Sequence, residues 1–200
     1  MLKLTLLRHG KVEFLNEGIC YGWTDIELND EGIADARRAG EVLQDESFDA
    51  VYSSPLIRTT QTSRIVMAHN QRDQTLPIQE LSALREYHFG KWEGVKYDKI
   101  LSEYADDWTL YMSGSQEFAP PSGETIKAFV QRVCDCMDAL RSKHADGHVL
   151  IVSHYGVISV IIPYLLELHG NTAWKFALNT GRIAQLEVTP DFARLVKLNL

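Results

Sequence analysis

The sequence contains few cysteines, and their arrangement excludes a disulfide-stapled scaffold. Only 3 cysteines occur in 200 residues, and Cys20, Cys134 and Cys136 include no CxxC pair. An odd number of cysteines without such a pair argues against a secreted protein and suits a reducing compartment. We therefore expect a cytoplasmic protein whose core needs neither a disulfide nor a structural metal.

Positive charge and long apolar segments are also scarce. The 20 basic residues are outnumbered by 27 acidic ones, which gives a net charge of −7, and the longest basic run is Arg37-Arg38. This balance argues against non-specific nucleic-acid binding. The one long apolar stretch, 149–168, contains His154, a glycine and a proline, so we interpret it as a strand followed by a buried helix. No export signal is recognisable, and we expect neither a nucleic-acid partner nor a membrane partner.

The remaining composition, 45% hydrophobic and 24% charged, is that of an ordinary globular domain. Apolar strands are expected at 2–7, 48–52, 76–78 and 149–152, with a terminal hairpin formed by 183–188 and 194–198. Amphipathic helices are expected after three capping residues, Asp30, Ser54 and Ser122. Strands that alternate with helices predict a three-layer α/β/α sandwich with a mostly parallel sheet. Residues 1–200 are expected to form one domain.

One segment breaks this alternation. Residues 81–122 are rich in aromatics and contain glycines and two adjacent prolines, which indicates a small inserted lid. The lid and its surroundings offer aromatic side chains for stacking on a substrate, although core packing is the more common role of such residues. These aromatics are Trp23, Tyr87, Phe89, Trp92, Trp108 and Tyr111.

Charged and polar groups follow three of the expected strands. Arg8-His9-Gly10 ends the first, Ser53-Ser54-Pro55 leads from the second toward Arg58, and Ser153-His154 ends the fourth. Ligands of open α/β sheets bind at the carboxyl ends of the strands, so two histidines and two arginines are expected to converge there. Each residue alone has a purely structural interpretation; the joint pattern favours a functional one.

The residue types narrow the chemistry of this site. Guanidinium groups bind phosphate or carboxylate, and two of them would repel a metal cation, so a metal site is the weaker option and no cofactor is expected. The chain has no GxxxxGK[ST], HExxH or DxDxT motif, and no cysteine is followed by arginine six positions later. With these chemistries disfavoured, phosphoryl transfer to a histidine nitrogen is the remaining reaction type. The leaving alkoxide then needs a proton, for which Glu86 is the first candidate and Glu93 the second.

Four segments resemble motifs of the histidine phosphatase family, also called the phosphoglycerate mutase-like superfamily. They are Leu7-Arg8-His9-Gly10, the run 53–62 (SSPLIRTTQT), the run 84–94 (LREYHFGKWEG) and the run 152–157 (VSHYGV). The resemblance implies the α/β sandwich of that family, His9 as the phosphorylated nucleophile and Glu86 as the proton donor. It also implies a phosphate pocket formed by Arg8, Arg58 and His154.

Two positions depart from the family pattern. Val12 and Leu15 stand where the family commonly has Ser or Thr and Asn, so the first loop would hold phosphate with fewer side-chain donors. Asn16 and Gly22 are the candidate additional substrate-binding residues of this loop.

The resemblance implies a metal-independent phosphatase acting on a small-molecule phosphate ester. Segments 122–133, 152–159 and 173–176 are similar to the α-ribazole phosphatase subfamily, which implies α-ribazole 5′-phosphate as substrate. The alternatives are a broad-specificity histidine phosphatase, a phosphoglycerate mutase-like enzyme, whose resemblance would imply a larger chain, and a phosphate-ligand-binding protein without turnover. The sequence does not indicate an oligomeric state.

Overall fold

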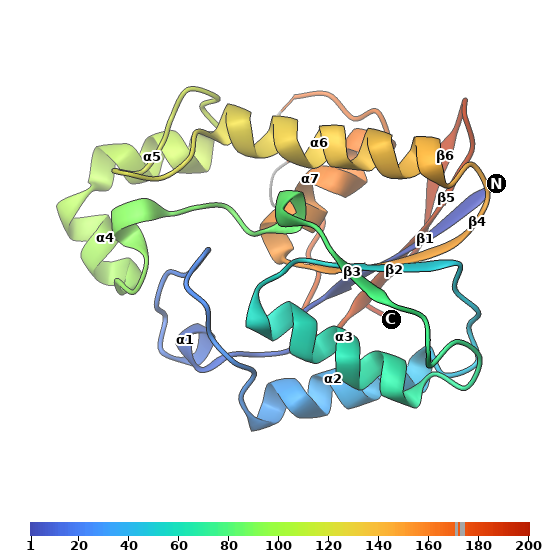
Figure 1. Ribbon diagram of the computed structural model, residues 1–200. Helices are drawn as coiled ribbons and strands as arrows, with labels where there is room; N and C mark the ends of the chain where they lie inside the picture. The colour runs from blue at the N-terminus through green and yellow to red at the C-terminus, as the bar shows by residue number, and fades with distance from the viewer. Residues whose placement is uncertain (171, 173–174) are drawn as a thin grey trace.

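The protein contains a six-stranded sheet with helices on both faces (Figure 1). The structure is a computed structural model that describes residues 1–170, 172 and 175–200. The strand order is β3-β2-β4-β1-β5-β6. β1 pairs in parallel with β4, which pairs in parallel with β2, and β2 with β3, whereas β5 and β6 are antiparallel. The mostly parallel α/β sandwich is therefore confirmed. The strands are β1 (Leu2–Arg8), β2 (Ala50–Ser53), β3 (Ile78–Glu80), β4 (Gly147–Ser153), β5 (Ile183–Val188) and β6 (Ala193–Leu198).

Helices α2 and α3 cover one face of the sheet, and α6 and α7 cover the other (Figure 1). The α-helices are α1 (Glu13–Asn16), α2 (Asp30–Val42), α3 (Ile57–His69), α4 (Tyr97–Glu103), α5 (Ala105–Ser113), α6 (Ile126–Lys143) and α7 (Tyr155–Leu165). The expected break at 81–122 contains α4, α5 and two 3₁₀ turns, η1 (Ser82–Leu84) and η2 (Gly90–Trp92). Whether this segment moves as a lid stays a prediction.

Alternation along the strands builds two cores, one on each face. On β1, Leu4 and Leu6 pack toward α6 and α7, whereas Leu7 packs toward α2 and α3. Successive strand side chains point to opposite faces, so a strand buried on both sides is apolar throughout. Residues 2 and 4–7 are buried for this reason, and Lys3 is half-buried.

Three expected helix starts were wrong by one to three residues. Asn29, not Asp30, caps α2, and its side chain accepts a hydrogen bond from the Gly32 N–H at 2.9 Å. Thr125, not Ser122, caps α6, because Ser122 has a left-handed backbone with φ +63°.

Ser54 does not cap α3, which starts at Ile57 after an extended residue rather than at Pro55. The side chain of Ser54 instead contacts a histidine from another strand end, as described below. The third strand is also shifted, since β3 covers 78–80 rather than 76–78.

The aromatics of the 81–122 segment divide into two groups. Trp92 is fully buried and packs against Tyr104, Trp108 and Phe118, so it serves the core. Tyr87, Phe89 and Tyr111 also contact one another but line a cavity. Stacking on a substrate is thus available only to part of the expected set.

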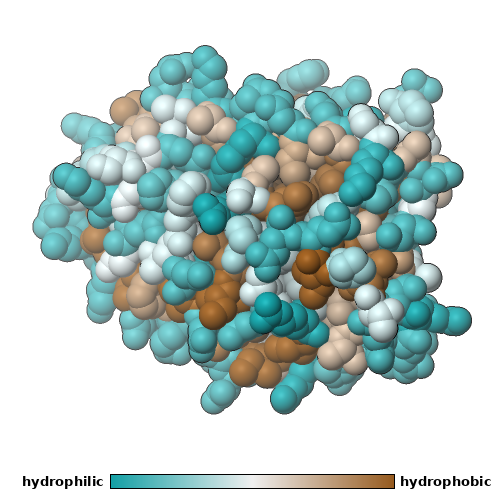
Figure 2. All heavy atoms as spheres, viewed as in Figure 1, coloured by the Kyte–Doolittle hydropathy of each residue, from teal (hydrophilic) through white to brown (hydrophobic). Residues whose placement is uncertain are grey.

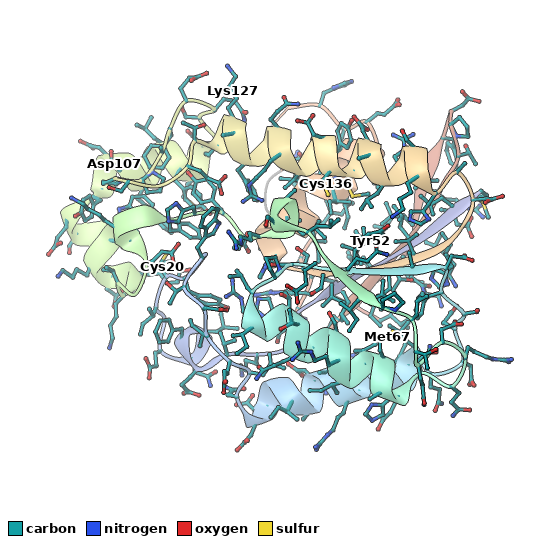
Figure 3. All side chains as sticks on the ribbon, viewed as in Figure 1. Cys20, Tyr52, Met67, Asp107, Lys127 and Cys136 are labelled. Atoms are coloured by element: carbon teal, nitrogen blue, oxygen red, sulfur yellow. The ribbon has the colours of Figure 1, made fainter. Side chains whose placement is uncertain are left out.

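All three cysteines are free, and Cys20 lies far from Cys136 (Figure 3).

His144 and His148 do not form a metal-binding pair, because His144 is hydrogen-bonded to the Tyr52 hydroxyl and His148 is hydrogen-bonded to the buried Thr5 hydroxyl. None of the helices in the described part of the chain is long and apolar enough to cross a membrane. Part of the segment 173–176 lies outside the described residues.

The N-cap of α2 is testable by comparing adjacent residues. Asn29→Ala removes the acceptor for the Gly32 N–H and is expected to lower the free energy of unfolding by about 1 kcal/mol. Asp30→Ala changes only an exposed first-turn charge and should cost about 0.5 kcal/mol or less at moderate salt. Urea unfolding of both variants decides between them. A larger loss of unfolding free energy for Asp30→Ala than for Asn29→Ala would indicate that Asp30 is the N-cap.

Candidate active site

Parallel pairing of β1 with β4 brings two histidines together. Arg8 is paired with Ser153, so His9 and His154, the next residue of each strand, leave the same edge of the sheet. Their ring centroids lie 5.2 Å apart, and their side chains are 2% and 0% exposed. Two imidazoles separated by 145 positions in the sequence thus share one buried site, as the strand ends predicted.

The ring of His9 is oriented by its own backbone. Its Nδ1 lies 2.7 Å from the carbonyl oxygen of Gly10. A carbonyl only accepts, so Nδ1 carries the proton and the lone pair is on Nε2. Burial, followed by the charges of Arg58 and Arg8, holds the pKa of His9 well below its usual value. His9 is therefore a neutral imidazole with an available nucleophilic nitrogen at neutral pH.

His154 is fixed through its other nitrogen. Its Nε2 lies 2.8 Å from the Ser54 hydroxyl, which follows β2, so three strand ends meet here. Its Nδ1 is buried and has no hydrogen-bond partner among the described residues. Burial, and then the charges of Arg58 and His9, lower the pKa of His154 well below the ordinary value. A ligand oxygen can satisfy the Nδ1 atom.

Arg58, in the first turn of α3, is fully buried. Its Nη1 donates to the Thr24 carbonyl at 2.9 Å and its Nη2 to the Gly22 carbonyl at 2.6 Å. The guanidinium also lies over the ring of Tyr21, 5.2 Å from its centroid. Its Nε is buried without a partner in the described part of the chain. A buried guanidinium without a carboxylate partner is strongly suited to an anion.

Arg8 approaches the same region from β1. Its Nη1 donates to the Leu178 carbonyl at 2.8 Å, and its guanidinium lies 5.1 Å from the centroid of the Tyr155 ring. The Nε of Arg8, like that of Arg58, has no partner among the residues the structure describes. Both arginines therefore keep donors for a ligand.

Glu86 is held beside the histidines by two backbone amides. Its Oε1 accepts from the Tyr87 N–H at 2.9 Å and its Oε2 from the Gly156 N–H at 3.0 Å. A Cβ at Gly156 would come within 2.2 Å of Oε1, so this close approach requires glycine. The bond from Gly156, two residues after His154, thus holds the carboxyl group of Glu86 close to this histidine.

The backbone around Glu86 is anchored by Arg132 of α6. Its guanidinium donates to the carbonyls of Ala83, Arg85 and Glu86 at 2.7–2.8 Å. It also forms an ion pair with Glu124 at 2.7 Å. Arg132 therefore fixes the position of Glu86 without needing to reach a ligand.

Glu93, the second candidate proton donor, has a different role. Its side chain is 12% exposed and accepts hydrogen bonds from the backbone of Trp23 at 2.8 Å, Thr24 at 2.5 Å and Phe89 at 3.2 Å. The hydroxyl of Thr24 donates to the same carboxylate. These bonds hold the loop whose carbonyls, from Gly22 and Thr24, bind Arg58. Glu93 is a positioning residue for that arginine.

The structure gathers His9, His154, Arg8, Arg58 and Glu86 at one edge of the sheet, but it does not place the two loop candidates with them. Asn16 is exposed at the end of α1 and is not a residue that lines the cavity described below. Gly22 is buried, its carbonyl accepts a hydrogen bond from Arg58, and a Cβ there would meet the Tyr87 carbonyl at 1.9 Å. Gly22 therefore supports the site indirectly.

Sequence reasoning did not find three contributors to the site. Tyr21 lies under Arg58, Thr62 accepts from the Gly10 N–H at 3.1 Å and donates to the Arg58 carbonyl, and Arg132 anchors Glu86. Thr62 lies one helical turn after Arg58 and was part of the quoted motif. Tyr21 and Arg132 had no comparable local signal, because each acts on a residue distant in sequence.

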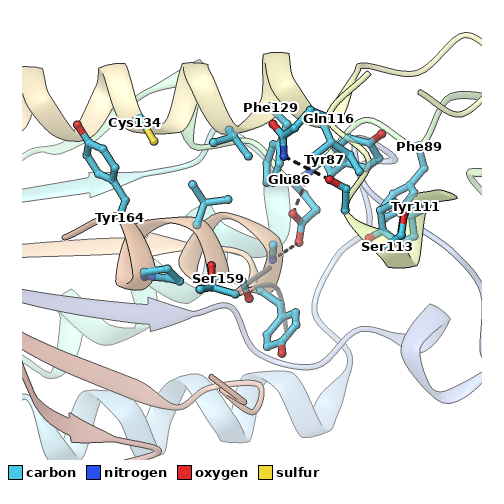
Figure 4. Close-up of a pocket in the computed structure, with 18 of the residues that line it drawn as sticks. Glu86, Tyr87, Phe89, Tyr111, Ser113, Gln116, Phe129, Cys134, Ser159 and Tyr164 are labelled. Atoms are coloured by element: carbon cyan, nitrogen blue, oxygen red, sulfur yellow. Dashed lines mark hydrogen bonds between the residues drawn. The ribbon is translucent and has the colours of Figure 1, made fainter. Parts of the chain in front are cut away.

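A cavity of about 590 Å³ opens beside Arg8, Glu86 and Gly156 and continues between α6 and α7 (Figure 4). Most of its wall is apolar or aromatic. On the face shown in Figure 2, hydrophobic residues form patches in the middle and lower part of the molecule, among hydrophilic residues. In the described residues no group of three or more His, Cys, Asp or Glu side chains could hold a metal ion.

Buried donors around two neutral imidazoles, with a carboxyl group alongside, are chemically suited to a phosphate group. The fold and site are those of an α/β enzyme of phosphoryl-group chemistry. Residues 4–200 match the family described as "Histidine phosphatase superfamily (branch 1)". The chain belongs to this superfamily, and it is a phosphatase that acts on phosphate esters.

Curated relatives and solved structures agree with this family. The chain is 31% identical over 198 residues to the adenosylcobalamin/alpha-ribazole phosphatase of Escherichia coli K12, covering 99% of this chain and 96% of that protein. It is 27% identical to the 2,3-bisphosphoglycerate-dependent phosphoglycerate mutase of Methanococcus vannielii, with 90% and 88% covered. The crystal structure of the alpha-ribazole phosphatase from Shigella flexneri superposes with a TM-score of 0.90 at 31% identity, with 99% and 96% covered.

Glu93→Gln tests the positioning role of this carboxylate. One carboxylate oxygen becomes an NH₂ donor that faces a backbone N–H, so the free energy of unfolding should fall by about 1–3 kcal/mol. Phosphate should also inhibit the variant more weakly, because the loop that holds Arg58 is loosened. The control is Glu117→Gln, whose side chain is 79% exposed, and which should change stability by less than about 1 kcal/mol. An unchanged phosphate inhibition constant would contradict this role.

Proposed function

We propose that the protein is a metal-independent phosphomonoesterase that works through a phosphohistidine at His9. The observation that carries this proposal is the orientation of His9, whose Nδ1 is bonded to Gly10 and whose Nε2 is left with its lone pair. An imidazole kept neutral by burial beside two arginines is a competent nucleophile at neutral pH.

In the first step, Nε2 of His9 forms a bond to phosphorus while the bond from phosphorus to the ester oxygen breaks. The carboxyl group of Glu86 gives its proton to the departing alkoxide. Arg8, Arg58 and Nδ1 of His154 donate to the equatorial oxygens and stabilise their charge. In the second step, water transfers a proton to Glu86 and attacks phosphorus, which releases phosphate and restores His9.

The proposed substrate is α-ribazole 5′-phosphate, which places the enzyme in the assembly of the cobalamin nucleotide loop. Support comes from the relatives named for this activity, which match nearly the whole chain at 30–31% identity. The three free cysteines support a cytoplasmic location. Contact of Asn16 with the phosphate stays a prediction.

The main alternative is a phosphoglycerate mutase-like enzyme, which the similarity to curated mutases favours. A mutase returns the phosphoryl group to a substrate oxygen instead of releasing it to water. Release of inorganic phosphate separates the two functions. A broad-specificity phosphatase and a phosphate-binding protein without turnover are the remaining alternatives.

The proposed function is tested by phosphate release from α-ribazole 5′-phosphate, 3-phosphoglycerate and an aryl phosphate in the presence of a chelator. Wild type should favour α-ribazole 5′-phosphate by about a hundredfold or more in kcat/KM, a difference of about 2.7 kcal/mol. His9→Ala should be inactive on all three. Similar rates on the three esters would leave a broad-specificity phosphatase, and activity that required a divalent metal would contradict the mechanism.

Glu86→Gln separates proton donation from positioning. The glutamine side chain can still accept from one of the two backbone amides but has no acidic proton. For alkyl phosphates kcat should fall about 10²–10⁴-fold, the usual contribution of general acid catalysis. The loss should be much smaller for 4-nitrophenyl phosphate, whose leaving group needs no proton. Equal losses on both esters would remove Glu86 from this role.

A further inference from the structure

The cavity extends well beyond the atoms that the phosphate would occupy. It starts at Arg8, Glu86 and Gly156 and continues along α7 past Ser159 to Tyr164, and along the facing side of α6 to Cys134. Gly156 and Tyr164 are eight positions apart, which corresponds to about 12 Å at the rise of an α-helix. We refer to the part between α6 and α7 as the α6–α7 cleft. Its length and the cavity volume of about 590 Å³ suit a drug-sized group rather than a three-carbon acid.

One face of each helix lines the α6–α7 cleft. Val130 and Cys134, one turn apart on α6, line it, as do Ser159 and Val160 of α7. Figure 4 shows Cys134 and Ser159 on the two facing helices. All four are only half-buried, so apolar surface is left for a ligand to cover. Covering apolar surface stabilises a complex by roughly 25 cal/mol per Å² before the costs of association.

Charge is confined to one end of this cavity. Among the described residues that line it, only Arg8 and Glu86 carry charged side chains, and both lie at the phosphate end. A carboxylate or a second phosphate on a leaving group in the α6–α7 cleft would lose water without gaining a cation from the described lining residues. Burial of an unpaired anion costs several kcal/mol.

Polar recognition is available as neutral hydroxyl groups. The Ser159 Oγ and the Tyr87 hydroxyl are both buried without a hydrogen-bond partner in the described part of the chain, and both residues line the cavity. Tyr87 is 3% exposed. Buried hydroxyls are ordinarily satisfied, so these two point to hydroxyl or ring-nitrogen groups on the ligand.

We propose that the α6–α7 cleft binds the leaving group of the substrate, and that it selects an uncharged, elongated alcohol with a flat apolar part and discriminates against esters carrying a second anion. This inference rests on the proposed function for the chemistry at His9. It adds Val130, Cys134, Ser159 and Val160 as residues that determine specificity. It also accounts for hydrolysis in preference to mutase activity, because mutase substrates carry both a carboxylate and a phosphate.

The test fills the cleft and compares two esters. Val130→Trp should lower kcat/KM for 1-naphthyl phosphate by about tenfold or more, mainly by raising KM, since loss of pocket contacts of this size costs 10–200-fold. For glycerol 3-phosphate, which leaves the cleft largely unfilled, the same variant should change kcat/KM less than about twofold. The matched control is Gln131→Trp, the next residue of α6, which is exposed and bonded to Asp135, and it should leave both esters unaffected. Equal losses on both esters, or none, would overturn the proposal.

A second measurement does not depend on turnover. Cys134 lines the cleft, whereas Cys136 on the same helix packs against the core, so the two thiols report on ligand binding and on unfolding respectively. Burial raises the pKa of Cys134, so alkylation is followed at alkaline pH by mass spectrometry. The non-hydrolysable 1-naphthylmethylphosphonate at about ten times its Kd should slow alkylation of Cys134 about tenfold. Alkylation of Cys136 should be unchanged.

The two measurements separate the possible failures. Protection of Cys134 with no phosphate release from either ester would support the cleft and contradict the proposed function. Phosphate release from both esters with no protection of Cys134 and no effect of Val130→Trp would contradict the cleft alone. Orthophosphate at the same occupancy should protect neither thiol, and protection of Cys134 by orthophosphate would also contradict a site for the leaving group.

Discussion

The site depends on the parallel register between β1 and β4. Pairing of Arg8 with Ser153 sets His9 and His154 at the same level of the sheet edge, with ring centroids 5.2 Å apart. A slip of one residue would send the side chains of a strand to the opposite face. Because both strands are buried on both faces, that slip would also disrupt the two cores, so the packing of the sheet and the geometry of the site are fixed by the same contacts.

Burial of positive charge is the second constraint. Arg58 is fully buried and has no carboxylate partner among the described residues, and backbone carbonyls of a loop that Glu93 holds in place accept its hydrogen bonds. The same burial lowers the pKa of both histidines. The result is a cavity end with excess positive charge and neutral imidazoles, which is electrostatically complementary to a phosphate dianion and leaves His9 free to act as a nucleophile.

Much of this could be predicted from sequence because its signals are local. Apolar strands that end in polar residues identified the sheet edge, and these residues proved to be neighbours there. The helix starts were less predictable, because Asn29, Leu56 and Thr125 take the capping position according to the backbone geometry of the preceding loop. Glu93 and Arg132 could not be assigned, since each acts through backbone groups that only the folded chain brings near. The α6–α7 cleft could not be predicted from the sequence either, because the apolar residues of a half-buried helix face have the same spacing as those of a core face.

In this account the phosphate group is recognised by charge and the leaving group by the shape of the α6–α7 cleft. The central claim is the mechanism, which requires a covalent intermediate at His9. The most direct measurement is rapid quenching of the enzyme with substrate at alkaline pH, where phosphohistidine survives, followed by mass spectrometry of the proteolysed chain. A phosphoryl group on His9 that appears and decays at rates compatible with turnover is the predicted result. Turnover without modification of His9, or a phosphoryl group on another residue, would contradict the account.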